Sequence, residues 1–222
     1  MAQGAGKRIG VVLAGCGFLD GAEIHEATLT LLELDRAGAT VRAAAPDVPQ
    51  MHVVDHVAGK PTPEKRGVLT EAARIVRGKI EPLANLRAAD LDAVIFPGGF
   101  GVAKNLCTFA VDGPNLKVDP QVERLIKEMH AAQKPMGLIC IAPVLAAKVL
   151  GAEHPRLTIG DDPETASIVE GLGAKHVVCK VEEIACDERL KLVSTPAYML
   201  GPSIFPVSQG IAKLVAKVIE LA

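Results

Sequence analysis

Short apolar runs alternate with amphipathic segments along this chain. Residues 9–14 form a continuous apolar run, as in strands that are buried on both faces of a parallel sheet. Residues 22–37 follow with apolar side chains three or four positions apart, which predicts a helix that ends at Gly38. The alternation continues, and it predicts strands at residues 41–45, 91–96, 136–139, 157–159, 176–178 and 192–194, and helices at residues 70–77, 122–132, 144–150, 164–172 and 207–221.

Strands that alternate with helices form parallel βαβ units. The sequence therefore predicts an α/β fold, with a doubly wound, mostly parallel sheet flanked by helices. No internal repeat or linker divides the chain, so residues 1–222 are expected to form a single domain with residues 1–7 as a disordered tail.

One segment interrupts the alternation. Residues 46–63 are rich in proline and too long for an ordinary connection, which indicates a functional or interface excursion. The segment carries several apolar residues, and exposed apolar patches often mark interfaces. Two structures remain open: contact with a second subunit, or a hairpin folded onto its own domain. The apolar residues are Met51, Val53, Val54 and Val57.

Composition narrows the function. Hydrophobic residues make up 49% of the chain and the formal net charge is −2, which argues against nucleic-acid binding and against a polybasic membrane anchor. No apolar run approaches the ~20 residues that span a bilayer. Five cysteines without a CxxC pair fit a reducing compartment and argue against a zinc site. We expect a cytoplasmic protein without a metal; a processed mitochondrial form fits the sequence equally.

Three turns follow predicted strands. Gly15-Cys16-Gly17 comes after the first strand, Pro97-Gly98-Gly99 after the third, and Cys140 after the fourth. In open parallel sheets, ligands bind in the crevice at the carboxyl ends of the strands. The three turns are therefore expected to meet at one functional site.

Cys140 lies where a strand ends and a helix begins, with Pro143 in the first helical turn. Such a turn is a nucleophile elbow with Cys in place of Ser. A helix N-terminus favours the thiolate, so a lowered pKa and a reactive thiol are expected. The alternative is a small buried hydrophobic residue. Main-chain N–H groups of Gly99 and Ile141 could form an oxyanion hole, although Pro97-Gly98-Gly99 could also be a plain turn.

The first helix supplies a candidate acid/base. Asp20 and Glu23 have capping-box spacing, which predicts Asp20 as the N-cap. Glu26 shares a helix row with Ala22 and Leu29, and burial there would raise its pKa and suit it to proton transfer; a solvated carboxylate is the alternative.

Histidines offer less. His25 points ~100° away from Glu26 and could reach the rim of the crevice. His52 and His56 have HxxxH spacing but no third ligand, so a structural or surface role is expected. No histidine follows Cys140 at a position where it could be argued to pair with the thiol.

These motifs together resemble the ElbB (ES) branch of the ThiJ/PfpI superfamily. The resemblance extends in order over nearly the whole chain. It is carried by Gly15-Cys16-Gly17, Asp20-Gly21-Ala22-Glu23-Ile24-His25-Glu26-Ala27, Phe96-Pro97-Gly98-Gly99-Phe100-Gly101-Val102-Ala103-Lys104-Asn105-Leu106, Gly137-Leu138-Ile139-Cys140-Ile141-Ala142-Pro143 and Thr195-Pro196-Ala197-Tyr198-Met199.

The resemblance implies a flavodoxin-like sheet. It also implies a cofactor-free glyoxalase that converts methylglyoxal or glyoxal to a 2-hydroxy acid, and a homodimer. The implied catalytic residues are Cys140 as nucleophile, Glu26 for proton transfer, and Gly99 and Ile141 as oxyanion donors. Residues predicted to bind the dicarbonyl substrate are Cys16, Gly98, Asn105 and His25.

The sequence departs from the amidotransferase and peptidase branches, which pair Cys with a downstream His. That departure leaves a Cys–Glu site, which is adequate for an aldehyde. Two alternatives remain: a redox-sensing or regulatory protein with an oxidisable Cys140, and a deglycase or amidohydrolase-like hydrolase.

Overall fold

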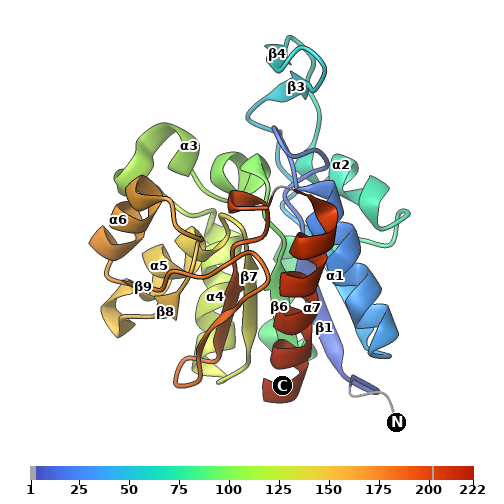
Figure 1. The fold of residues 1–222 in the computed structure, drawn as a ribbon. Coiled ribbons are helices and arrows are strands. Elements are labelled where there is room, and N and C mark those ends of the chain that lie inside the picture. The colour runs from blue at the N-terminus through green and yellow to red at the C-terminus, as the bar shows by residue number, and fades with distance from the viewer. Residues whose placement is uncertain (1–3, 202) are drawn as a thin grey trace.

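The computed structural model describes residues 4–201 and 203–222, which are built around a seven-stranded sheet (Figure 1). The strand order is β10-β11-β7-β6-β1-β2-β5, and every neighbouring pair is parallel except β10 and β11. The strands are β1 (Arg8–Val12), β2 (Thr40–Ala45), β5 (Glu81–Pro82), β6 (Ala93–Phe96), β7 (Met136–Ile139), β10 (Ala185–Asp187) and β11 (Leu192–Thr195).

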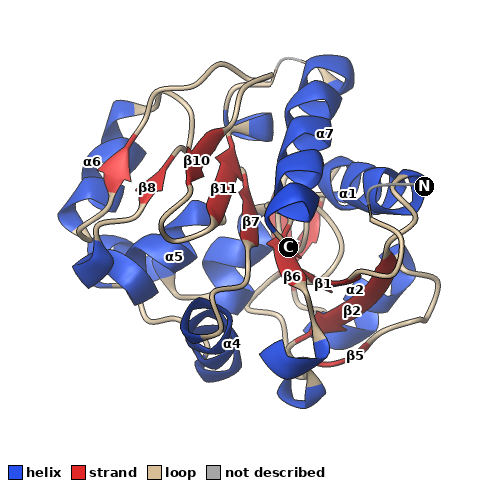
Figure 2. Ribbon diagram, turned by 90° about the horizontal axis from the view of Figure 1, so that it is seen from below, coloured by secondary structure: helices blue, strands red, loops and turns tan. Residues whose placement is uncertain are grey.

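Helices cover both faces of this sheet (Figure 2). α1 (Ile24–Arg36), α2 (Val68–Ile75) and α7 (Ile204–Leu221) pack on one face, and α4 (Pro120–Ala131), α5 (Pro143–Leu150) and α6 (Pro163–Gly171) belong to the core on the other. The remaining elements are α3 (Phe109–Asp112) and two small sheets, β3 (Val53–Asp55) with β4 (Lys60–Thr62) and β8 (Arg156–Leu157) with β9 (Lys175–His176). The fold is the α/β, flavodoxin-like class that was expected.

The central strands explain why apolar runs identified them so well. Every residue of β6 and β7 is buried, because helices cover the sheet on both sides. Glycines in the strands let the helices approach: a Cβ on Gly137 would lie 2.9 Å from a methyl group of Leu214 in α7. The small side chains of this aromatic-poor chain thus fill a two-sided core.

The strand order also places the site. From β1 the chain moves to β2 on one side and returns to β6 on the other, so the loops after β1 and β6 separate at a topological switch point. Main-chain bonds join the two loops: Gly101 N–H donates to Gly21 O over 2.9 Å, and Glu23 N–H donates to Gly98 O over 2.9 Å. Since β7 neighbours β6, Cys140 reaches the same edge.

The start of α1 corrects one expectation. Glu23 is the N-cap, and its carboxylate accepts the N–H of Glu26 over 2.7 Å. Asp20 belongs to the turn before the helix, where it accepts the N–H of Val54 over 2.6 Å. The predicted capping box is wrong because the glycine-rich turn extends further along the chain than the spacing suggested.

The predicted N-terminal tail is shorter than expected. Residues 4–7 form a turn, with Gly4 N–H bonded to Ala37 O over 2.9 Å and Lys7 Nζ bonded to Ala222 O over 2.6 Å. Disorder is therefore the wrong description of residues 4–7, which α1 and α7 hold in place. Residues 1–3 lie outside the described residues.

The proline-rich segment contains the antiparallel hairpin β3–β4, which projects beyond the carboxyl edge of the sheet (Figure 1). Val53 at its base is buried, whereas Val57 at its tip is fully exposed. The alternative considered was a hairpin folded onto its own domain; the segment forms a hairpin, and its tip projects away from the domain. Contact between its tip and a second subunit stays a prediction.

Candidate active site

Cys140 forms a sharp turn between β7 and α5. Its φ of 62° lies in the left-handed region, which non-glycine residues rarely adopt, and such strain is typical of a nucleophile elbow. The turn is held from below, because Cys140 N–H donates to Thr195 O over 2.9 Å. α5 then begins at Pro143. The residue is 7% exposed, so little of the thiol is open to solvent.

Two main-chain donors face the thiol. The N–H groups of Gly99 and Ile141 both hydrogen-bond to the Cys140 side chain. The loop after β6 can approach the Cys140 turn closely only with glycine at position 98, because a Cβ there would lie 2.4 Å from the Cβ of Cys140. Gly99 has a φ of 97°, which glycine adopts without strain.

Glu26 reaches the same point from α1. Its side chain is fully buried, as its position on an apolar helix row predicted. One carboxyl oxygen accepts Gly98 N–H over 2.8 Å and the other accepts Tyr198 N–H over 3.2 Å. Glu26 lies beside Cys140: each group shifts the pKa of the other, and a Cβ on Gly98 would lie 2.4 Å from the Cβ of Cys140 and 2.7 Å from a carboxyl oxygen of Glu26.

Burial dominates the electrostatics of Glu26. Removal from water, with a smaller contribution from the nearby Glu23, raises the pKa of this carboxyl to about 8, although the N–H groups of Tyr198 and Gly98 oppose the shift. At neutral pH the carboxyl is therefore mostly protonated.

Burial also raises the pKa of the Cys140 thiol well above its ordinary value, and the neighbouring Glu26 adds to this. The N–H groups of Gly99 and Ile141 act in the opposite direction but do not prevail. The expectation that the helix N-terminus holds a thiolate is therefore wrong for the resting site. Desolvation and Glu26 outweigh the main-chain N–H groups, and the thiol keeps its proton at neutral pH.

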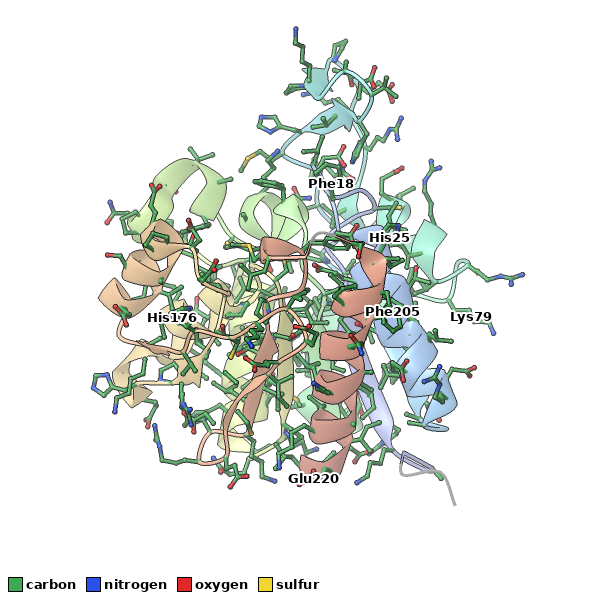
Figure 3. All side chains as sticks on the ribbon, in the orientation of Figure 1. Phe18, His25, Lys79, His176, Phe205 and Glu220 are labelled. Atoms are coloured by element: carbon green, nitrogen blue, oxygen red, sulfur yellow. The ribbon has the colours of Figure 1, made fainter. Side chains whose placement is uncertain are left out.

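His25 lies at the rim, one residue before Glu26 (Figure 3). Its Nδ1 is 2.7 Å from the hydroxyl of Tyr198, and the two rings are in contact. Tyr198 follows Ala197, whose φ of 45° is unusual for a residue with a side chain. Sequence reasoning gave Tyr198 no site role, since only its place in a family motif marked it.

Asn105 is buried and bonded to main chain. Its Nδ2 donates to Ala14 O and to Asp20 O, each over 2.9 Å, and its Oδ1 accepts Met51 N–H over 3.0 Å. These bonds tie the loop after β1 to the segment after β2. Asn105, which was predicted to bind substrate, thus has its side-chain amide bonded to main-chain groups that hold these loops together.

Cys16 lies near residues of α2 rather than beside the Cys140–Glu26 pair. Its charged neighbours are Glu71, Arg74 and Asp20, and burial raises the pKa of its thiol. Glu71 is itself buried and paired with Arg74 over 3.0 Å. Of the four predicted substrate-binding residues, Gly98 contacts the Cys140–Glu26 pair and His25 lies beside it.

Two phenylalanines that sequence reasoning missed stand near these glycine turns. Phe18 and Phe100 are about half exposed, and Phe100 N–H donates to Phe18 O over 2.7 Å. Lys104 Nζ lies 5.5 Å from the centre of the Phe100 ring. Figure 3 shows Phe18 at the same end of the molecule as His25.

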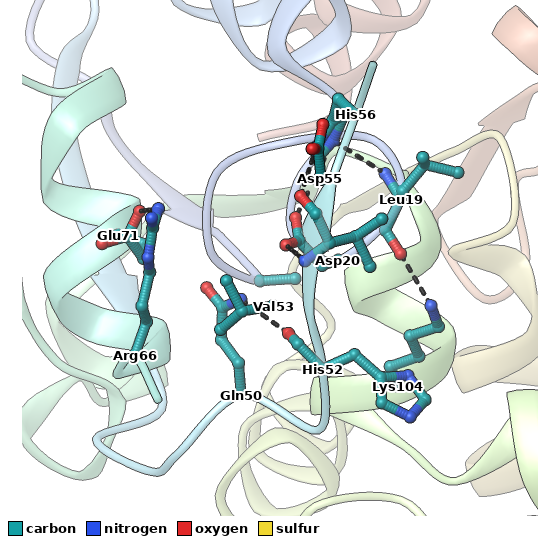
Figure 4. Close-up of polar contacts among 12 residues, drawn as sticks. Leu19, Asp20, Gln50, His52, Val53, Asp55, His56, Arg66, Glu71 and Lys104 are labelled. Atoms are coloured by element: carbon teal, nitrogen blue, oxygen red, sulfur yellow. Dashed lines mark hydrogen bonds and ion pairs between the residues drawn. The ribbon is translucent and has the colours of Figure 1, made fainter. Parts of the chain in front are cut away.

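A polar cluster anchors the β3–β4 hairpin to the loop after β1 (Figure 4). His56 Nε2 accepts Leu19 N–H over 3.3 Å and lies 3.8 Å from a carboxylate oxygen of Asp20. Lys104 Nζ donates to Leu19 O over 2.7 Å. His56 thus has the structural role expected for it, and no trio of metal-ligating side chains is grouped anywhere in residues 4–201 and 203–222.

In the part of the chain that the structure describes, no helix has the length and apolar character needed to cross a bilayer.

Together, the fold and the cysteine turn define a class of protein. An elbow cysteine at the carboxyl edge of a flavodoxin-like sheet is the architecture of the class I glutamine amidotransferase-like proteins. Within that class the chain belongs to the DJ-1/PfpI family, whose model matches residues 12–177. The superfamily includes glyoxalases and deglycases, and its members are often enzymes.

Its relatives identify the branch. The human glutamine amidotransferase-like class 1 domain-containing protein 3, mitochondrial, is 55% identical over 96% of this chain and 83% of its own length. The zebrafish (Danio rerio) ES1 protein, mitochondrial, is 39% identical over 86% of this chain and 76% of its own. A crystal structure from Ehrlichia chaffeensis, described as an isoprenoid biosynthesis protein with an amidotransferase-like domain, has a TM-score of 0.91 at 33% identity and covers 97% of this chain and 99% of that one. The predicted ElbB/ES resemblance is confirmed.

Proposed function

We propose that this protein is a glutathione-independent glyoxalase that converts methylglyoxal or glyoxal to the corresponding 2-hydroxy acid. The supporting observation is the fully buried Glu26 carboxyl beside the Cys140 thiol, with the N–H groups of Gly99 and Ile141 acting on the same thiol. A nucleophile, a proton carrier and an oxyanion site side by side meet the needs of this isomerisation.

The first step requires that the pair lose one proton. The remaining proton is then shared between Cys140 and Glu26, and the form with a protonated carboxyl carries a thiolate. The thiolate sulfur attacks the aldehyde carbon of methylglyoxal and forms a hemithioacetal. The oxygen that gains charge accepts hydrogen bonds from Gly99 and Ile141 N–H.

The second step moves a proton between carbons. Glu26 first gives its proton to the hemithioacetal oxygen. The ionised carboxylate then removes the hydrogen from the carbon bonded to sulfur and returns it to the neighbouring carbonyl carbon, while the hydroxyl proton passes to the oxygen of that carbonyl. The product is a thioester of lactate on Cys140. Water then cleaves the C–S bond, so that methylglyoxal plus one water gives lactic acid and the free thiol. A carboxyl with a pKa of about 8 can both accept and return a proton near neutral pH.

The site favours small aldehydes over amides. Cys140 is only 7% exposed, which admits a compact reactive carbonyl more readily than a peptide. Aldehydes add a thiolate without the leaving-group protonation that amide cleavage needs. The redox-sensor alternative needs the same thiolate and gives the buried Glu26 carboxyl no role in proton transfer between carbons, so it is less favoured.

Turnover of methylglyoxal without glutathione tests the proposal. We expect wild type to produce lactate, Cys140→Ser to abolish production and Glu26→Gln to reduce it at least ~100-fold, the usual range for losing a general acid/base. Cys186→Ser serves as the matched control, because it removes a partly buried thiol elsewhere in the chain. Wild-type activity no higher than the buffer rate, or full activity in Cys140→Ser, would reject the proposal.

Two further features are proposed with this function. We infer a homodimer in which the exposed tip of the β3–β4 hairpin contacts the second subunit. The names of the relatives place those proteins in mitochondria, which supports the processed mitochondrial form over the cytoplasmic one. Fractionation of source cells distinguishes the two locations.

A further inference from the structure

A cleft lies at the amino ends of the strands, away from the cysteine turn. Its volume is about 490 Å³, within the range of small-molecule sites, and residues of β8, β9 and β10 line it. Asp187 at its wall pairs with Leu192, the first residue of β11, whereas the amide of Cys140 bonds to Thr195, the last residue of that strand. The cleft and the thiol therefore lie at opposite ends of β11.

His154, Arg156, Lys175 and Arg189 line the cleft together with two acidic residues, Asp187 and Glu188. Arg189 is paired with Glu153 over 3.3 Å, which leaves the charges of Arg156 and Lys175 to be accounted for.

Both acids already have partners. Asp187 accepts the main-chain N–H of Arg156 over 2.9 Å and that of Leu190 over 3.0 Å. Glu188 lies 3.5 Å from Lys217. Both carboxylates thus engage groups other than the side chains of Arg156 and Lys175.

Arg156 and Lys175 are direct cross-strand partners. They occupy matching positions on the parallel strands β8 and β9, so their side chains leave the same face, and both are exposed. Among the described residues, neither side chain forms an ion pair. Like charges in directly opposed positions destabilise a sheet. A bound anion would convert this repulsion into two favourable contacts.

We propose that this cleft binds the phosphate group of a small molecule. Arg156 offers a planar fork that fits two phosphate oxygens, and Lys175 adds a point charge beside it. His154 Nδ1–H donates to Gly173 O over 2.9 Å, which fixes the ring at the wall of the cleft. The net charge of −2 and the compact cleft favour a small anion over a nucleic acid.

NMR titration of the whole chain at constant ionic strength tests this site, with inorganic phosphate and phenyl phosphate as the two probes. We expect amide shift changes confined to residues 154–157, 173–176 and 187–189, and a Kd at least ~10-fold weaker in Arg156→Gln and in Lys175→Gln, since a charge-assisted contact contributes about this much. Tighter binding of phenyl phosphate assigns the cleft to a phosphate ester, and equal binding assigns it to free phosphate.

Lys79→Gln is the matched control, because Lys79 is exposed and lies on the opposite side of the molecule from His176, the residue after Lys175 (Figure 3). It should bind both probes like wild type, and so should Cys140→Ser, since the cleft does not depend on the proposed chemistry. Without ligand, Arg156→Gln and Lys175→Gln should unfold at the same temperature as wild type or higher, because each relieves repulsion. Equal affinity in wild type and both charge variants, shifts spread over the surface, or no binding at about 10 mM, where a millimolar site would be largely filled, would overturn the proposal.

Discussion

Glu26 should make the stability of this protein fall steeply as the pH rises. Its pKa is about 8 in the folded state and 4.5 when unperturbed, so the folded chain keeps a proton that the unfolded chain has lost. The resulting stabilisation is fully present below pH 4.5 and disappears as the pH rises through about 8. The shift corresponds to about 5 kcal/mol in total, with a slope of about 1.4 kcal/mol per pH unit between the two values.

Glu26→Gln removes the titrating carboxyl and therefore its contribution to the slope of stability against pH. The amide still fits, but it offers one acceptor to two donors, the N–H groups of Gly98 and Tyr198. Loss of one of these bonds destabilises the variant by about 1–3 kcal/mol at every pH. Wild type should thus be clearly more stable near pH 5, and its advantage should shrink by about 4 kcal/mol by pH 8.

Urea unfolding followed by circular dichroism from pH 5 to 8.5 measures this difference, in which the titration of all other groups cancels. Asp35→Asn is the control, because it removes an exposed carboxyl from the same helix and should keep the wild-type slope. Parallel curves for wild type and Glu26→Gln would show that the buried carboxyl is ionised in the folded state, and a protonated Glu26 in the resting site would then be refuted.

Three other outcomes follow from the site. On methylglyoxal, kcat/KM should rise about tenfold per pH unit below pH 8 and then level off, because the Cys140–Glu26 pair must lose one proton; a flat profile would contradict this order of protonation. Gly98→Ala should lower kcat/KM at least ~10-fold and destabilise the fold by about 1–3 kcal/mol, because its Cβ would lie 2.4 Å from the Cβ of Cys140. Gly171→Ala is its control: a Cβ there meets nothing within 4 Å, so equal losses in both variants would refute the steric argument. Val57→Asp should leave stability unchanged and halve the mass in solution measured by light scattering, whereas an unaltered mass would mean that the hairpin tip is not the dimer contact.

Much of the fold was readable from the sequence because the sheet is covered on both sides. Continuous apolar runs mark β6 and β7, whose residues are all buried. The elbow was equally visible, since a strand that ends at Cys140 and a helix that begins at Pro143 leave no room for a longer connection. Helical spacing placed Glu26 on the row of Ala22 and Leu29, and the structure decides between the two alternatives left open there, because the carboxyl is fully buried.

The rest depended on contacts that no local pattern contains. The start of α1 is set by the turn that binds Val54 through Asp20, so the local capping rule chose the wrong residue. The state of the Cys140 thiol depends on total burial and on Glu26, both of which arise only when α1 packs beside β7. Tyr198 joins the site from 172 positions further along the chain than Glu26, through its main-chain N–H.

Main-chain groups and side chains have different roles around the Cys140 thiol. The donors that face the Cys140 thiol are peptide groups, of Gly99 and Ile141, whereas the exposed aromatic surface nearby comes from Phe18 and Phe100. A residue keeps its peptide N–H when its side chain is replaced by almost any other, so substitutions around the thiol leave these donors in place. Under the proposed function, variation at the two phenylalanines would change which small molecules reach the thiol while the main-chain donors stay in place.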